Sequence, residues 1–147
     1  MTAQSIHKER IREHLEVLKE AVALGIEKRP ATIGFHASAC AIDLLELYLH
    51  KMDKIPIGKQ IKHDWFKRPK SGQKIKPLSE RQIPIAFSHK EEIFDLLYTL
   101  EEKRTRLVYG KATSLETKQV LDTFEKVKNI LLPLLSEAGE EIEDPNI

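Results

Sequence analysis

The pattern of apolar and polar positions predicts four long helices. Apolar residues recur three or four positions apart over residues 2–29, 32–52, 89–109 and 114–138, which places them on one face of a helix. Each helix must cover its apolar face with another helix, because it cannot bury that face alone. The pattern therefore predicts an all-α fold, an up-and-down four-helix bundle, in a single domain of residues 1–147.

Local signals mark three of the predicted helix boundaries. Ser88 and Glu91 have the spacing of a capping box at the start of the third helix, and Gly110 stands where its end favours a left-handed residue. Thr113 and Glu116 offer a second capping box for the last helix. The third and fourth helices are therefore predicted to be joined by a very short connection.

Residues 53–87 form a long irregular segment between the second and third helices. Proline and glycine recur along it, and residues 54–90 hold ten Lys or Arg against two acidic residues, a net charge of +8 that leaves −7 on the rest of the chain. A structureless connection of this length in a compact domain is often functional. We expect a basic insertion on an acidic body, whose candidate contacts with a polyanion are Lys62, Lys67 and Arg68.

Two aromatic residues of this segment, Trp65 and Phe66, allow two interpretations. In a basic loop they have the chemistry to stack on nucleic-acid bases. Aromatic residues in long loops also commonly fasten the loop to the core, and the sequence leaves both possibilities open.

Composition sets the broad class of the protein. The 147 residues suffice for one hydrophobic core, and 24 basic against 23 acidic residues give almost no net charge. Cys40 is the single cysteine, which excludes an internal disulfide and suits a reducing compartment. No apolar run has transmembrane length and residues 1–12 are polar, so we expect a cytoplasmic protein without a membrane partner. Charged residues at 32% lean towards a heat-loving source.

The second helix combines a small-residue block with a polar stripe. Residues 37–41 are all Ala, Ser or Cys, which lets another helix approach closely and suggests the centre of the bundle. Four polar residues lie on another face at helical spacing, namely His36, Asp43, Glu46 and His50. This stripe either faces solvent, supplies Asp43 or Glu46 as a partner for an arginine of the third helix, or binds a metal through Glu46 and His50.

The rest of the sequence gives little support to the metal interpretation. Di-iron bundles use Glu-x-x-His from two helices, and no such set occurs in this chain. His7 and His14 are a heptad apart on the first helix, and a solvated face explains them most simply. From sequence we therefore expect no metal and no cofactor.

Arg104 lies at the centre of the apolar stripe of the third helix. A guanidinium does not lose its proton, so burying it requires a carboxylate partner or a groove open to water. The alternative is that its stem packs while its charged head extends to solvent.

Residues 104–110 read Arg-Thr-Arg-Leu-Val-Tyr-Gly. This text resembles the Arg-x4-6-His motif that closes the third helix of the HEPN (higher eukaryotes and prokaryotes nucleotide-binding) domain family, and the small-residue helix upstream extends the resemblance. Arg104 takes the place of the motif Arg, while Tyr109 stands where the motif has His. The resemblance implies a helical homodimer that brings two motifs together. It also implies RNA binding or metal-independent RNA cleavage, and in many members pairing with a nucleotidyltransferase as toxin and antitoxin.

Two functions follow as expectations. In the first, Arg104 and Arg106 hold RNA or nucleotide phosphates near Tyr109 at a dimer cleft, and any residual endoribonuclease activity uses Arg104 and Tyr109 as catalytic residues. In the second, the chain is a non-catalytic subunit that binds a protein such as a nucleotidyltransferase. Tyrosine has a pKa near 10 and is a poor general base at neutral pH, so the missing His favours binding over catalysis.

Overall fold

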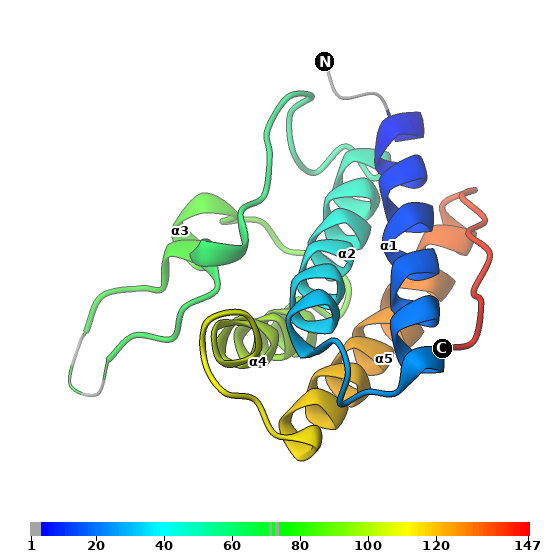
Figure 1. Ribbon diagram of the computed structural model, residues 1–147. Helices are drawn as coiled ribbons and strands as arrows, with labels where there is room; N and C mark the ends of the chain where they lie inside the picture. The colour runs from blue at the N-terminus through cyan, green and yellow to red at the C-terminus, as the bar shows by residue number, and fades with distance from the viewer. Residues whose placement is uncertain (1–3, 71, 73) are drawn as a thin grey trace.

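The computed structural model describes residues 4–147 except residues 71 and 73. Its elements are α1 (Gln4–Leu24), α2 (Pro30–Lys51), the 3-10 helix η1 (His63–Trp65), α3 (Leu78–Gln82), α4 (Lys90–Tyr109) and α5 (Ser114–Glu137). The described residues contain no strand. The predicted all-α fold is confirmed, with four long helices packed together and an irregular segment between α2 and α4 (Figure 1).

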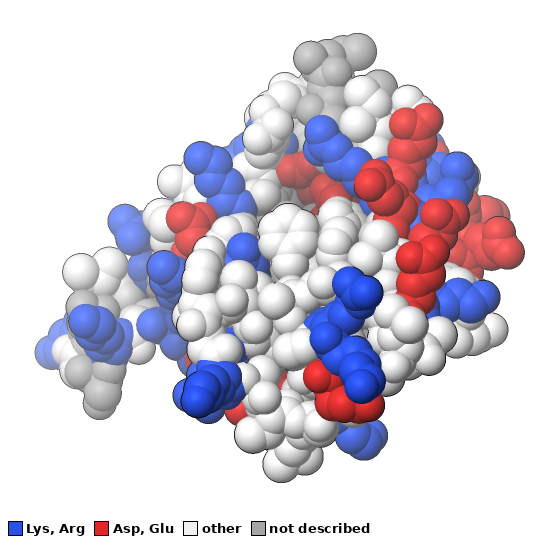
Figure 2. Space-filling view, in the orientation of Figure 1, with Lys and Arg blue, Asp and Glu red and all other residues white. Residues whose placement is uncertain are grey.

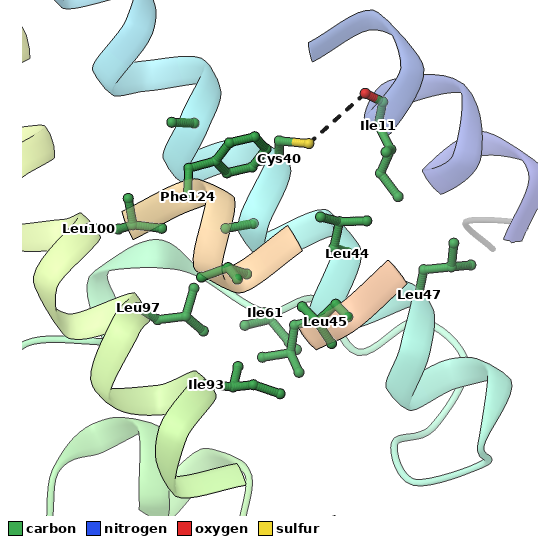
Figure 3. Close-up of a cluster of buried hydrophobic side chains, with 14 of the residues drawn as sticks. Ile11, Cys40, Leu44, Leu45, Leu47, Ile61, Ile93, Leu97, Leu100 and Phe124 are labelled. Carbon is green, nitrogen blue, oxygen red and sulfur yellow. Dashed lines mark hydrogen bonds between the residues drawn. The ribbon is translucent and has the colours of Figure 1, made fainter. Parts of the chain in front are cut away.

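Helix α2 is the central helix, as its small side chains predict. It packs against α1, α4 and α5, and α4 and α5 also pack against each other. Figure 1 shows α1 and α2 side by side, with α5 behind them and α4 seen nearly end-on. Ala37, Cys40 and Ala41 are fully buried. The core of leucine, isoleucine and phenylalanine side chains gathers around α2 (Figure 3), where the Cys40 thiol donates to the carbonyl of Ile11 at 4.0 Å.

Close approach of α2 and α4 depends on Gly34. A Cβ atom at this position would lie 2.7 Å from Cβ of Leu107, far inside van der Waals contact. Leu107 is itself buried. The absence of a side chain at Gly34 therefore lets the two helices meet at the turn that follows Arg104.

The α1–α2 connection differs from the sequence prediction at both ends. α1 was predicted to end at residue 29 but ends at Leu24, and Gly25 after it has a positive φ of +112°. α2 was predicted to begin at residue 32 but begins at Pro30. Proline is well suited to the first turn, because the N–H it lacks has no partner within the helix there.

The capping signals predicted for the two ends of α4 do not form as expected. Its N-cap is His89 at φ 61°, without a side-chain cap, so the Ser88–Glu91 capping box does not form. Gly110 has φ −113°, which is extended and not left-handed; a Cβ there would instead lie 2.9 Å from the carbonyl oxygen of Arg106. The second capping box is confirmed, since Thr113 accepts from the backbone N–H of Glu116 and Glu116 accepts from that of Thr113.

The basic segment is folded onto the bundle. Phe66 is fully buried and packs edge-on against Phe94, while Trp65 is half-buried against the core. η1 contacts α2, α3 and α4. Phe66 is therefore a core residue, and α3 is a short helix within the segment that was predicted to be irregular.

The acidic C-terminal residues also pack against the bundle. Glu140 contacts Lys8 at 3.4 Å and Lys51 at 3.1 Å. Asp144 accepts a hydrogen bond of 2.7 Å from Lys128, whose side chain is fully buried. Within the described part of the chain, none of the helices combines the length and apolarity needed to cross a membrane.

Candidate functional site

A groove of about 400 Å³ lies between α2, the η1 segment and α4. Small side chains of α2 leave this space open. The insertion contributes Lys62, His63 and Asp64 to its lining, α4 contributes Arg104, and α2 contributes Asp43. Its lining residues are Phe35, Ser38, Ala39, Ile42, Asp43, Ile61, Lys62, His63, Asp64 and Arg104.

Arg104 is half-buried at this groove. Its guanidinium carbon lies 5.8 Å from the ring centroid of Phe35, a cation–π contact. Asp43 and Glu46 do not pair with it, and among the described residues no carboxylate forms an ion pair with Arg104. Of the three interpretations of the polar stripe, pairing of Asp43 or Glu46 with Arg104 is therefore wrong, and the positive charge of Arg104 faces the groove.

The structure does not bring the other two residues of the motif into the groove. Tyr109 is 76% exposed and is not among the lining residues. Arg106 pairs with Glu116, with Nε donating to Oε2 at 2.8 Å. This hydrogen bond raises the pKa of Arg106 and, together with the N–H of Thr113, lowers the pKa of Glu116 to about 2. Arg106 thus serves the α4–α5 connection, and Arg104 and Tyr109 form no common site within one chain.

The basic candidates of the insertion separate into three environments. Lys62 lines the Arg104 groove, and Lys67 is exposed at a second, basic hollow of about 430 Å³ that also includes Lys70, Lys76 and Arg81. Arg68 lines this hollow too, but it is bound to Glu102 and, at 2.9 Å, to Asp95 of α4. Its positive charge is therefore largely compensated.

The polar stripe of α2 faces α1. His7 of α1 lies with Nε2 2.9 Å from Oε2 of Glu46 and Nδ1 3.6 Å from Oδ1 of Asp43. His14 Nε2 lies 3.3 Å from Oδ2 of Asp43, and His14 Nδ1 is 2.8 Å from His36 Nδ1. His7 is only 1% exposed, so the prediction of a solvated face is wrong for it.

These contacts join a histidine–carboxylate cluster, which comprises His7, His14, His36, Asp43, Glu46 and His50. Asp43 and then Glu46 raise the pKa of His7 to about 9, outweighing its burial. Burial would raise the pKa of Asp43, but its contacts with His14 and His7 lower it overall. Burial and the charge of His14 lower the pKa of His36.

Sequence reasoning identified both halves of the cluster but not their contact. His7 and His14 are a heptad apart, and so are His36, Asp43 and His50. Two such stripes on consecutive, antiparallel helices can meet, and this was the signal available. Donor atoms of His7, Glu46 and His50 lie within 4.8 Å of one another, so these three residues are the described ones that can hold a metal ion.

Comparison with known proteins gives no relative. The chain matches no protein-family model, no curated protein and no solved structure at a significant level. The function must therefore be inferred from the geometry described above.

Proposed function

We propose that this chain is a degenerate HEPN-like protein that binds RNA, through its phosphates, at the Arg104 groove without cleaving it. The observation that carries the proposal is a half-buried arginine, Arg104, that forms no ion pair with any described carboxylate and lies beside an open groove. Partial burial of an arginine costs desolvation free energy unless an anion pairs with the charge. A phosphate accepts two parallel hydrogen bonds from a guanidinium, so it is a well-matched ligand.

The surroundings of Arg104 favour a nucleic acid over a free anion. The Phe35 ring is 45% exposed beside the guanidinium, so it offers a face on which a base can stack. Lys62 lines the same groove, and Lys67 extends the positive charge along the insertion. Figure 2 shows basic side chains on the side of this insertion, and acidic side chains interspersed with basic ones on the side of α1. An approaching polyanion is thus steered towards the groove.

The same geometry argues for binding over catalysis. Metal-independent RNA cleavage needs a general acid or base close to the scissile phosphate. Tyr109 is directed to solvent and lies outside the groove of its own chain. The function supported best is therefore retention of RNA with cleavage lost or weak.

Fluorescence anisotropy with a labelled single-stranded oligoribonucleotide tests this proposal. Arg104→Ala should weaken binding by tenfold or more, since one good phosphate contact contributes about 1.4 kcal/mol or more. Arg106→Ala is the matched control, because it removes the same charge from the same helix but outside the groove. Equal affinity of the wild type and Arg104→Ala, or equal losses in the two variants, would refute a specific role for Arg104.

Exposed apolar side chains on the insertion favour a second candidate function. Ile57 and Ile75 are 74% and 64% exposed, which suits a non-catalytic subunit that binds a protein such as a nucleotidyltransferase. Under this alternative the wild type shows RNA affinity no higher than an unrelated neutral protein. The anisotropy measurement separates the two.

A further inference from the structure

Three side chains at the open end of the α1–α2 hairpin have the donor set of a transition-metal site. His7 comes from the second turn of α1, whereas Glu46 and His50 lie one turn apart near the end of α2. Their donor atoms lie within 4.8 Å of one another. Two imidazoles and one carboxylate are a ligand set that zinc uses in proteins. From this convergence we propose that His7, Glu46 and His50 bind a divalent transition metal, with Zn²⁺ as the first choice.

The nitrogens of His7 carry the argument. The side chain is 1% exposed, and neither ring nitrogen forms a hydrogen bond with any described residue. Nε2 is 2.9 Å from Oε2 of Glu46, yet this contact lacks the geometry of a hydrogen bond. A buried imidazole without hydrogen bonds is costly. A cation between the nitrogen and the carboxylate oxygen would satisfy both donors.

His50 completes the set. Its ring is stacked on that of His7, with centroids 5.7 Å apart and planes inclined by 26°. Among the described residues, its ring nitrogens form no hydrogen bond or ion pair. Two imidazoles thus lie together against one carboxylate, and the nitrogens of His7 contact Glu46 and Asp43 without forming a well-aligned hydrogen bond.

The separations suit zinc after small side-chain movements. Zinc bonds to nitrogen and oxygen are about 2.0–2.2 Å long, so tetrahedral donors lie about 3.3 Å apart. The observed Nε2–Oε2 distance is 2.9 Å and all three donors fall within 4.8 Å. Rotation of side chains, without movement of the helices, brings the donors to the required spacing.

Neighbouring groups already orient two of these ligands. The backbone N–H of Ile61 donates to Oε1 of Glu46 at 2.5 Å, which leaves Oε2 facing His7. Nδ1 of His7 faces Asp43 at 3.6 Å. A carboxylate behind the ligating histidine is the usual outer partner in zinc sites, where it fixes the ring and strengthens the ligand. Asp43 therefore acts as a positioning residue.

A metal bound here would cross-link α1 and α2 at the end of the hairpin opposite its turn. The α1–α2 connection closes one end, and the proposed site joins the other, near the contacts of Glu140 with Lys8 and Lys51. A ligand that binds only the folded state raises its stability. The proposal stands on the α1–α2 cluster alone and does not depend on RNA binding.

Metal binding to the full-length, chelator-treated protein tests the proposal. Competition with a chromophoric chelator should show one Zn²⁺ per chain, Co²⁺ should give the d–d absorption of a low-symmetry nitrogen and oxygen site, and Zn²⁺ should raise Tm. Glu46→Gln keeps an oxygen that can accept from Ile61 but removes the ligand charge. We expect this variant and His50→Gln to lose these three signals. Asp43→Asn should weaken binding by 10- to 100-fold.

His89→Gln is the matched control, because it removes an exposed histidine from the start of α4. It should bind Zn²⁺ as the wild type does. Circular dichroism checks that each variant is folded, and His50→Gln keeps the test decisive where Glu46→Gln does not fold. No stoichiometric binding by the wild type, or binding unaffected by both Glu46→Gln and His50→Gln, would overturn the proposal. The cluster would then be a buried ion pair only.

Discussion

At the scale of single residues, charged side chains of the same type differ in their contacts and therefore in what they can bind. Arg104 and Arg106 are two positions apart on α4, but Arg104 faces the groove and Arg106 is bound to Glu116. Lys128 is fully buried, yet it has carboxylates at 2.7 Å and 3.0 Å from Asp144 and Glu125. Burial would lower the pKa of Lys128, but hydrogen bonds to Asp144 and Glu125 outweigh burial and raise it.

Removing Asp144 should destabilise the protein, because it leaves the buried ammonium of Lys128 with one carboxylate fewer. We expect Asp144→Asn to lower the free energy of unfolding by about 1.5–3 kcal/mol at neutral pH, the range for a hydrogen bond to a charged group. Urea denaturation measures this change. Lys118→Ala is the control, since the Lys118–Asp122 pair is exposed and contributes about 0.5 kcal/mol or less.

The contribution of Asp144 should depend on pH. Burial raises its pKa, but hydrogen bonds from Lys128 and from the N–H of Asn146 lower it overall, below the ordinary value of 3.8. A carboxyl group with a lowered folded-state pKa stabilises the protein fully above its unfolded-state pKa and loses this effect as pH falls through the folded-state value. The stability difference between wild type and Asp144→Asn should be constant above about pH 5 and shrink below pH 3.8. A difference that grows on acidification would contradict the ion pair.

At the scale of elements, the contact of α2 with α4 sets the groove, and Gly34 permits that contact. Gly34→Ala should destabilise the fold by about 1–3 kcal/mol through overpacking against Leu107, although alanine favours helix formation by about 1 kcal/mol. Thermal or urea unfolding measures the loss. In the double variant with Leu107→Ala the Gly34→Ala penalty should disappear, because its steric cause is gone. An equal penalty in both backgrounds would exclude this explanation.

The four long helices could be predicted because apolar residues at helical spacing identify the buried face of each helix. The Thr113–Glu116 capping box formed as predicted, since both partners lie on an exposed helix start. The Ser88–Glu91 box did not, because the chain enters α4 through His89 in a left-handed conformation after Phe87, which packs on the core. The residues of a capping box are local in sequence, so they do not predict how a neighbouring residue such as Phe87 packs on the core.

The candidate site could be predicted only in part. The position of Arg104 on the apolar stripe indicated a charge at a helix seam, and the structure places it at a groove. Its partner could not be predicted, because Asp43 and Glu46 are equally well spaced for α1 and for α4. Only packing shows that His7 and His14 of α1 take both carboxylates.

At the scale of the whole molecule, charge is distributed unevenly along the chain. A net charge near zero combines a basic insertion with an acidic remainder. The acidic side chains visible in Figure 2 lie mostly on the side of α1, interspersed with basic ones. Attraction of a polyanion therefore depends on the face presented and on ionic strength. The homodimer implied by the HEPN resemblance stays a prediction, and with it the idea that two copies of Tyr109 meet at one cleft.

The salt dependence of RNA affinity tests the central claim most directly. For single strands, log K falls against log salt concentration with a slope of about −0.7 for each phosphate neutralised. We predict that Arg104→Ala makes this slope shallower by about 0.7 and lowers the affinity, while Arg106→Ala leaves the slope unchanged. Parallel salt plots for wild type and Arg104→Ala, or RNA binding that does not depend on salt, would contradict the account.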